Sequence, residues 1–290
     1  YLEHWTFLLD LYIIYKKVRN ELGEGVKFPR WAKAYKFNPK GAASKLKDIT
    51  WQVGKYGTLT PVAELEPVTV AGSTISRATL HNMDYIRTKG IKIGDILNIV
   101  KAAEVIPKVE KVISTSSDSI EVHEPEYCPY CSTKTVRDGA VVKCPAKACP
   151  MRVESQLISL VSKDILDMDE FGPRVIEYLM AEKDVYHMHQ LLDESNYEDI
   201  EYEDGFGHGI KAKLIESIRK VKSGIELYRL IPAMMIEGIG RTIGKKIAEI
   251  NTLENILNGD IEWNPTIGEK AREIITKELL SPEGLEHFKT

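Results

Sequence analysis

The sequence predicts a multi-domain α+β protein that combines a β-barrel, a four-cysteine metal-binding ribbon and an all-α domain. Residues 28–113 contain short β-branched runs that Gly, Pro and Asp interrupt roughly every ten residues, which is typical of a small closed barrel. After Met151 the apolar residues recur with the 3.6-residue period of helices. All four cysteines of the 290-residue chain lie between these regions.

The barrel region is predicted to contain one helix. The stretch SRATLHNMDYIRTKG, within Ala71–Gly90, has the character of a short helix laid between strands. Five strands and one helix are the arrangement of an OB-fold, which we place at residues 38–118. OB-folds often bind nucleic acid, but the fold alone does not fix a function.

The cysteines have the spacing of a structural zinc site in residues 119–152. A C-x2-C pair and a C-x4-C pair are separated by 12 residues, and the ligands are Cys128, Cys131, Cys144 and Cys149. Four thiolates can occupy the corners of the tetrahedron that zinc prefers, and two pairs at the ends of a hairpin supply them. Disulfides are the alternative, and they fit a secreted chain better than this one.

The spacer also contains DGAVVK, from Asp138 to Lys143, which looks like the D-G-x-V-x-K element of nucleotidyltransferases. Asp-Gly between two short β-branched runs is equally the expected turn of a hairpin. We favour the hairpin, because a cysteine pair tethers each end of this segment to the predicted metal.

Residues 153–290 contain an internal repeat of a glycine turn followed by a helix. The last glycines of the four turns are spaced by 35, 33 and 28 residues: Gly172, Gly207, Gly240 and Gly268. This pattern predicts four helix-hairpin-helix units, in which backbone N–H groups of the turn approach a phosphate without reading a base. A plain helix connection is the alternative for any one turn.

The four turns are unequal. The second and third have both glycines, whereas Glu170 and Thr266 replace the leading glycine in the first and fourth. We therefore expect the outer turns mainly to pack and the middle turns to contact DNA. The residues predicted to make these contacts are Gly205, Gly207, Gly238, Gly240 and Arg241.

Charge is distributed unevenly along the chain, although the formal net charge is only -4. Residues 27–111 contain 15 Lys and Arg against 7 Asp and Glu, whereas residues 164–204 contain 2 against 14. Clustered solvated faces are one explanation, but a basic first half favours a polyanionic partner. Because no apolar run approaches the ~20 residues of a membrane span, we expect a cytoplasmic protein without a membrane partner.

In this order, the modules resemble the C-terminal portion of NAD-dependent, bacterial-type DNA ligases, from about Phe28 onward. The most specific matches besides the cysteines and the repeats are PRWAKAYKF, QVGKYGTLTPVAELEPVTVAGSTISRATLHN and IGDILNIVKAAEVIPKV. The resemblance implies that residues 1–37 end an adenylation domain, that the partner is nicked double-stranded DNA, and that NAD and Mg2+ serve the adenylation step. The bound zinc ion would be structural.

The resemblance also assigns roles to three lysines. Lys36 falls in the family's last adenylation motif, where a lysine contacts the adenylate phosphate; a surface lysine on an edge strand is the alternative. Lys55 lies in Gly54-Lys55-Tyr56-Gly57, where the family usually has G-R-T-G. The positive charge is therefore kept, but the bidentate hydrogen bonding of an arginine guanidinium is lost. Lys101 is a second predicted DNA-backbone contact, two residues before Ala103, where the family generally has glycine.

The 290 residues contain no K-x-D-G motif, which supplies the lysine nucleophile of a self-adenylating ligase. We expect the chain to be incomplete alone, for one of three reasons. A second subunit carries the adenylation domain, as in a split, phage-type ligase; the sequence is part of a longer chain; or it is a binding-only relative. We favour the first, because the residues before Phe28 do not simply continue the family pattern.

The function predicted is therefore to clamp nicked duplex DNA for phosphodiester sealing. A non-catalytic DNA-structure-binding protein built from the same modules is the main alternative. A zinc-ribbon scaffold for a protein complex is a weaker one, because the paired glycine turns argue for DNA.

Overall fold

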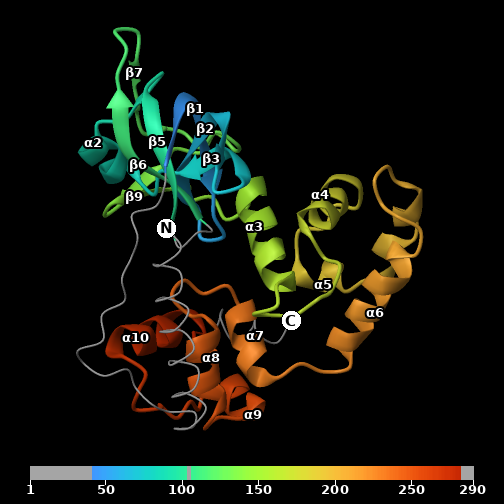
Figure 1. Ribbon diagram of the computed structural model, residues 1–290. Helices are drawn as coiled ribbons and strands as arrows, with labels where there is room; N and C mark the ends of the chain where they lie inside the picture. The colour runs from blue at the N-terminus through green and yellow to red at the C-terminus, as the bar shows by residue number, and fades with distance from the viewer. Residues whose placement is uncertain (1–40, 103–105, 282–290) are drawn as a thin grey trace, which may run out of the picture. The chain divides into compact units, whose positions relative to one another are not determined.

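The computed structural model describes residues 41–102 and 106–281 (Figure 1). The predicted end of an adenylation domain at residues 1–37, including Lys36, lies outside the described residues. None of the helices in the described ranges has both the length and the apolar character needed to cross a bilayer.

Five strands form a closed barrel. They are β1 (Ala42–Val53), β2 (Thr58–Val70), β3 (Ser73–Thr79), β5 (Ile96–Ala102) and β6 (Ile106–Ser114). β1 pairs antiparallel with both β2 and β5, and β3 closes the ring by pairing parallel with β6 at Thr79 and Lys108. Alternate side chains of these strands, such as Leu46, Leu65 and Leu97, are fully buried inside. The predicted five-stranded OB-fold barrel is confirmed.

The helix of the barrel, α2 (Met83–Lys89), is shorter than predicted. Asn82 accepts a hydrogen bond from the backbone of Tyr85, and Gly90 ends the helix in the left-handed conformation, at φ 63°. The predicted helical stretch, which begins at Ser76, was therefore wrong over residues 76–79, which belong to β3. There the backbone groups pair with β2, and this pairing outweighs the weak local helix preference.

The cysteine ribbon continues the barrel sheet. Its hairpin consists of β8 (Val136–Asp138) and β9 (Val141–Lys143), and β9 pairs with β2. Gly139 takes a positive φ of 60° in the turn, so the hairpin predicted from DGAVVK is confirmed. A separate two-stranded sheet joins β4 (Lys92–Ile93) to β7 (Ile120–Glu121).

The second half of the described chain is helical, as predicted. The helices are α3 (Pro150–Val161), α4 (Pro173–Glu182), α5 (Met188–Leu191), α6 (Ile210–Lys222), α7 (Leu227–Ala233), α8 (Arg241–Ala248), α9 (Leu253–Leu257) and α10 (Glu269–Glu278). Two 3-10 helices, η1 (Glu194–Tyr197) and η2 (Ile200–Tyr202), precede α6.

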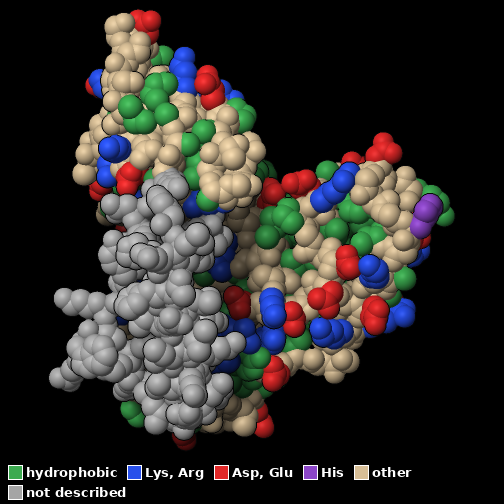
Figure 2. Space-filling view, viewed as in Figure 1, with side chains coloured by type: hydrophobic (Ala, Val, Ile, Leu, Met, Phe, Trp, Pro, Cys, Tyr) green, Lys and Arg blue, Asp and Glu red, His purple; other side chains and the backbone are tan. Residues whose placement is uncertain are grey.

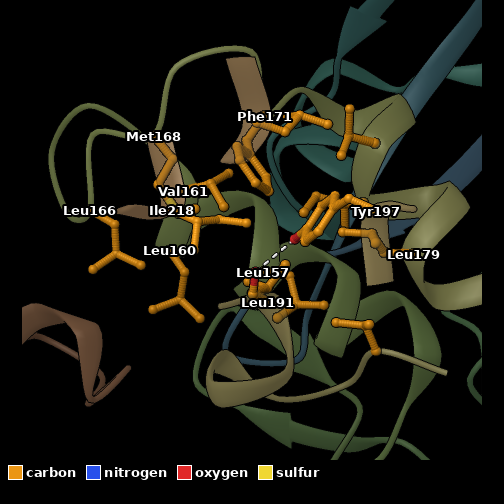
Figure 3. Close-up of a cluster of buried hydrophobic side chains, with 14 of the residues drawn as sticks. Leu157, Leu160, Val161, Leu166, Met168, Phe171, Leu179, Leu191, Tyr197 and Ile218 are labelled. Atoms are coloured by element: carbon orange, nitrogen blue, oxygen red, sulfur yellow. Dashed lines mark hydrogen bonds between the residues drawn. The ribbon is translucent and has the colours of Figure 1, made fainter. Parts of the chain in front are cut away.

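The helices bury two separate apolar cores. The first gathers side chains between Leu157 and Val221, and the second gathers side chains between Ile231 and Leu279. Tyr197 lies fully buried in the first core, where its hydroxyl donates a 2.7 Å hydrogen bond to the carbonyl of Leu191 (Figure 3). The phenol is thus buried without leaving a polar atom unpaired, which would be costly. Each core supports two of the four glycine turns.

Candidate metal centre and nucleic-acid interface

The four cysteine sulfurs converge on one point. Cys128, Cys131, Cys144 and Cys149 come from the ribbon and from the start of α3, and their Sγ atoms all lie within 4.8 Å of one another. All four cysteines are free thiols, so the structure does not contain the disulfides of the alternative interpretation. Within the described residues this is the one group of three or more potential ligands close enough to share a metal ion.

The sulfur geometry fits a tetrahedral metal. The Sγ atoms of Cys128 and Cys149 are 3.9 Å apart, and those of Cys131 and Cys144 are 3.5 Å apart. With Zn–S bonds of ~2.3 Å, the edge of the tetrahedron would be about 3.8 Å. These two edges lie on either side of that value, and all sulfur pairs lie within 4.8 Å, so the cysteines could hold zinc.

Because the site is largely buried, deprotonated cysteines are unfavourable there unless a cation is bound. Burial raises the pKa of Cys144 to about 12 and also raises the pKa of Cys149. The side-chain hydrogen bond between Cys131 and Thr133 instead lowers the pKa of Cys131 to about 6. A bound divalent cation reverses this preference, because it stabilises the deprotonated sulfurs directly.

The Gly54–Gly57 hairpin joins the barrel to the metal ligands. Cys144 donates its backbone N–H to the carbonyl of Gly57 at 2.8 Å. Gly57 has a φ of 83°, and a Cβ added there would lie 2.3 Å from the Cys144 carbonyl oxygen. A side chain at this position would therefore strain the backbone and push the ligand strand away from β2 at the same time.

We expect Gly57→Ala to lower the melting temperature by at least roughly 4 °C. The left-handed conformation alone costs a non-glycine residue about 1–2 kcal/mol, and about 1 kcal/mol corresponds to ~2–4 °C in a domain of this size. Gly72→Ala is the matched control, because Gly72 has a φ of 75° but a Cβ there meets no described atom within 4 Å. Thermal melting of both variants measures the difference, and equal shifts would mean that the carbonyl contact adds nothing.

Lys55, in the same hairpin, points to helix α3. Its Nζ donates a 2.8 Å hydrogen bond to the hydroxyl of Ser159, and its carbonyl accepts one from Gln156. Burial lowers the pKa of Lys55, and the nearby carboxylate of Asp164 opposes this effect. Lys101 lies elsewhere on the barrel and donates to Ser73. The structure therefore does not bring these two predicted DNA contacts together.

Three of the four glycine turns share a backbone conformation. The leading position has a positive φ of 67° at Glu170, 86° at Gly205 and 86° at Gly238. The fourth turn differs, since Thr266 is held by the side chain of Asn264 and is not among the described residues with positive φ. The first turn thus keeps the geometry of the repeat without its glycine.

Side chains of the protein itself contact part of the second turn. Its helix begins after Gly209, two residues beyond the predicted Gly207. The Gly209 N–H donates to a carboxylate oxygen of Glu201 at 2.6 Å. The guanidinium of Arg174 covers Gly205, where an added Cβ would lie 1.7 Å from one of its nitrogens. Gly205 and Gly209 are therefore in contact with other side chains of the chain, whereas Gly207 is open.

The third turn leads into a hollow lined by cations. Gly240 is the N-cap of α8, and the hollow, about 440 Å3 in volume, is lined by Arg241, Thr242, Lys245, Lys246 and Glu249. Arg241 is paired with Asp164 at 3.0 Å. On the face seen in Figure 2, Lys and Arg side chains are interspersed with Asp and Glu. The lining of the hollow, by contrast, carries three cations against the one carboxylate of Glu249. The hollow is therefore a local concentration of positive charge.

The glycines of the third turn serve different needs. The positive φ of Gly238, 86°, favours glycine, whereas Gly240 has an extended backbone, at φ -109°. Among the described residues, no atom lies within 4 Å of a Cβ added at Gly240. Gly207 is equally open. Both are exposed, so a group outside the described chain could approach their backbone closely.

Sequence analysis missed two residues beside the hollow. Gly244 lies inside α8, where an added Cβ would be 2.5 Å from the carbonyl of Tyr228 on α7. A glycine within a helix costs about 1 kcal/mol relative to alanine, so Gly244 was a detectable sign of close packing. The ring of Tyr228 lies within 5.5 Å of three cationic groups, for which the sequence contains no comparable signal.

Comparison with known proteins shows which proteins this chain resembles. Residues 43–121 match the family model described as the NAD-dependent DNA ligase OB-fold domain. Over 233 residues the chain is 40% identical to a DNA ligase of Aliarcobacter butzleri, covering 80% of this chain and 36% of that protein.

Two further bacterial relatives give the same result. The chain is 41% identical to a DNA ligase of Sulfurovum sp. over 79% of its length, and 40% identical to one of Clostridioides difficile over 85%. It spans less than two fifths of each relative, 36% and 37% respectively. The chain therefore belongs to the NAD-dependent DNA ligase family, of which it represents a portion that includes the OB-fold domain.

Proposed function

We propose that this chain is the DNA-binding portion of an NAD-dependent DNA ligase and that it clamps nicked duplex DNA while the phosphodiester bond is sealed. The observation that carries the proposal is the hollow along α8, where Arg241, Lys245 and Lys246 surround space for an anion. The exposed turn Gly238–Gly240 precedes it directly. Membership of the ligase family makes a DNA phosphate the natural ligand.

In this proposal the contacts are to the DNA backbone and are independent of sequence. The third helix-hairpin-helix turn provides the main contact through Gly238, Gly240 and Arg241. Lys55, Lys101 and the more covered turn of Gly205 and Gly207 provide further ones. Binding that releases counterions from phosphates weakens steeply as salt rises, with a slope of about -0.9 for each neutralised phosphate.

The four cysteines are proposed to bind one structural zinc ion. Such an ion supplies no chemistry to the reaction; it fixes the ribbon, in which Val142 pairs with Leu59 of the barrel. Closed four-cysteine sites contribute folding free energy directly. The ribbon would thereby hold the Gly54–Gly57 hairpin in one position.

Catalysis requires groups beyond those described. We propose that Lys36 contacts the adenylate phosphate, and that the nucleophilic lysine comes from another segment or from a second subunit, since K-x-D-G is absent from the 290 residues. NAD and Mg2+ would act with that adenylation domain. The alternative remains a DNA-structure-binding protein without a part in sealing.

The charge contribution is tested with the double variant Arg241→Gln/Lys245→Gln. We expect its affinity for a fluorescent nicked duplex to fall roughly tenfold or more at ~0.1 M salt, and the salt slope to become shallower by about 2. Fluorescence anisotropy over a salt series gives both values. The control is Lys220→Gln/Lys222→Gln at the far end of α6, which removes the same charge. An equal loss in the control would refute a specific role for the hollow.

A ligation assay separates the two functions. The chain is mixed with a preadenylated ligase adenylation domain and nicked DNA, and sealing is followed on a gel. Sealing that depends on this chain supports the ligase proposal. Nick binding without any effect on sealing would favour the DNA-structure-binding alternative.

A further inference from the structure

We propose that Tyr228 is a positioning residue for the DNA-binding hollow, because its ring holds Arg241 and Lys245 in place before a phosphate arrives. This inference rests on the proposed function of the hollow and adds to it a residue on a different helix. Tyr228 lies on α7, whereas both cations belong to α8.

The geometry places one ring among three cations. The guanidinium carbon of Arg241 is 5.5 Å from the ring centroid, and Nζ of Lys245 is 5.3 Å from it. Arg229, next to Tyr228 in the sequence, places its guanidinium carbon at 5.5 Å. All three distances fall within the ~6 Å range of favourable cation–π contacts.

The backbone explains how a ring from α7 reaches two residues of α8. Arg241 and Lys245 are four residues apart, so they lie on the same face of the helix. Gly244 faces α7 as well, and a Cβ there would lie 2.5 Å from the Tyr228 carbonyl and 3.1 Å from Pro232. The missing side chain lets the two helices approach until the ring of Tyr228 comes within reach of both cations.

Unsupported cations at this spacing would repel one another and turn into solvent. The ring offers each of them an attractive surface, and Tyr228 accepts a 3.2 Å hydrogen bond from Nε of Arg229. Asp164 and Glu226 add carboxylates that pair with Arg241 and Arg229 respectively. Side chains already fixed near the hollow lose less conformational entropy when an anion binds. Tyr228 should therefore affect affinity without touching DNA.

The test compares Tyr228→Leu with Tyr228→Phe. Phenylalanine keeps the ring face but lacks the hydroxyl, so we expect its affinity for nicked duplex to stay within about twofold of wild type. Leucine removes both groups, and we expect a three- to tenfold loss. Equal losses in the two variants would assign the effect to the hydroxyl and overturn the ring mechanism.

A second readout does not depend on DNA. In NMR spectra of the free protein, the ring current of Tyr228 should shift the Arg241 side-chain resonances upfield; the shift should persist in Tyr228→Phe and vanish in Tyr228→Leu. If Tyr228→Leu does not fold, Tyr228→Met replaces it. An Arg241 shift that survives loss of the ring would overturn the inference. If wild type fails to bind nicked DNA, the proposed function fails, while the NMR comparison still tests the positioning role.

Discussion

Cys144→Ser is expected to abolish stoichiometric zinc binding and to lower the melting temperature by at least about 10 °C. The Cys144 sulfur is buried 3.5 Å from that of Cys131, and a serine hydroxyl is a poor ligand for zinc. The three remaining thiols, of which Cys128 and Cys149 are buried, would then lack a complete metal site. Metal content by mass spectrometry should give one zinc per wild-type chain and less than one for the variant, and calorimetry gives the melting temperature.

His123→Ala is the matched control for this substitution. Histidine is also a zinc ligand by chemistry, but His123 lies outside the cluster of four sulfurs. We expect this variant to keep one zinc and the wild-type melting temperature. A wild-type protein that contains no zinc, and whose melting is unchanged by a chelator, would contradict the metal site. So would Cys144→Ser with its zinc retained.

The barrel and the cysteine cluster were predictable because the sequence patterns that indicate them are short and local. Alternating apolar residues specify which face of a strand is buried, and two close cysteine pairs specify a metal site almost without regard to the intervening sequence. The error at residues 76–79 has the opposite cause. Those residues are fixed by pairing with β2, and a strand partner cannot be recognised from a short segment alone.

The individual contacts of the candidate nucleic-acid interface could not be predicted, because they also depend on residues far apart in the sequence. Glu170 adopts a φ of 67° that is uncommon outside glycine, so the first turn differs from the middle two in sequence although its leading residue also has a positive φ. Lys55 meets Ser159 across 104 residues of chain. Arg174, which covers Gly205, and Tyr228, which holds cations, carry no motif. Such contacts depend on tertiary packing, which has no signature in spacing or composition.

Gly240→Val is expected to weaken binding of nicked duplex at least tenfold while leaving the fold intact. The extended backbone of Gly240 suits any residue, and a Cβ added there meets no described atom within 4 Å. The loss at a helix N-cap is about 1 kcal/mol or less, so the melting temperature should fall by no more than roughly 4 °C. A phosphate approaching the turn would instead meet two methyl groups, and a charge-assisted hydrogen bond worth about 1.5–3 kcal/mol would be lost.

Gly268→Val is a close match as a control. Gly268 is likewise the N-cap of its helix, with extended backbone, and a Cβ there also meets no described atom within 4 Å. Its turn, however, has Thr266 in place of the leading glycine and lacks the positive φ of Gly238. We expect its DNA affinity to stay within about twofold of wild type. Equal weakening by both valines would mean that the third turn has no privileged contact with DNA. No weakening by either would mean that phosphates do not approach these turns, and would revive the zinc-ribbon scaffold as an explanation.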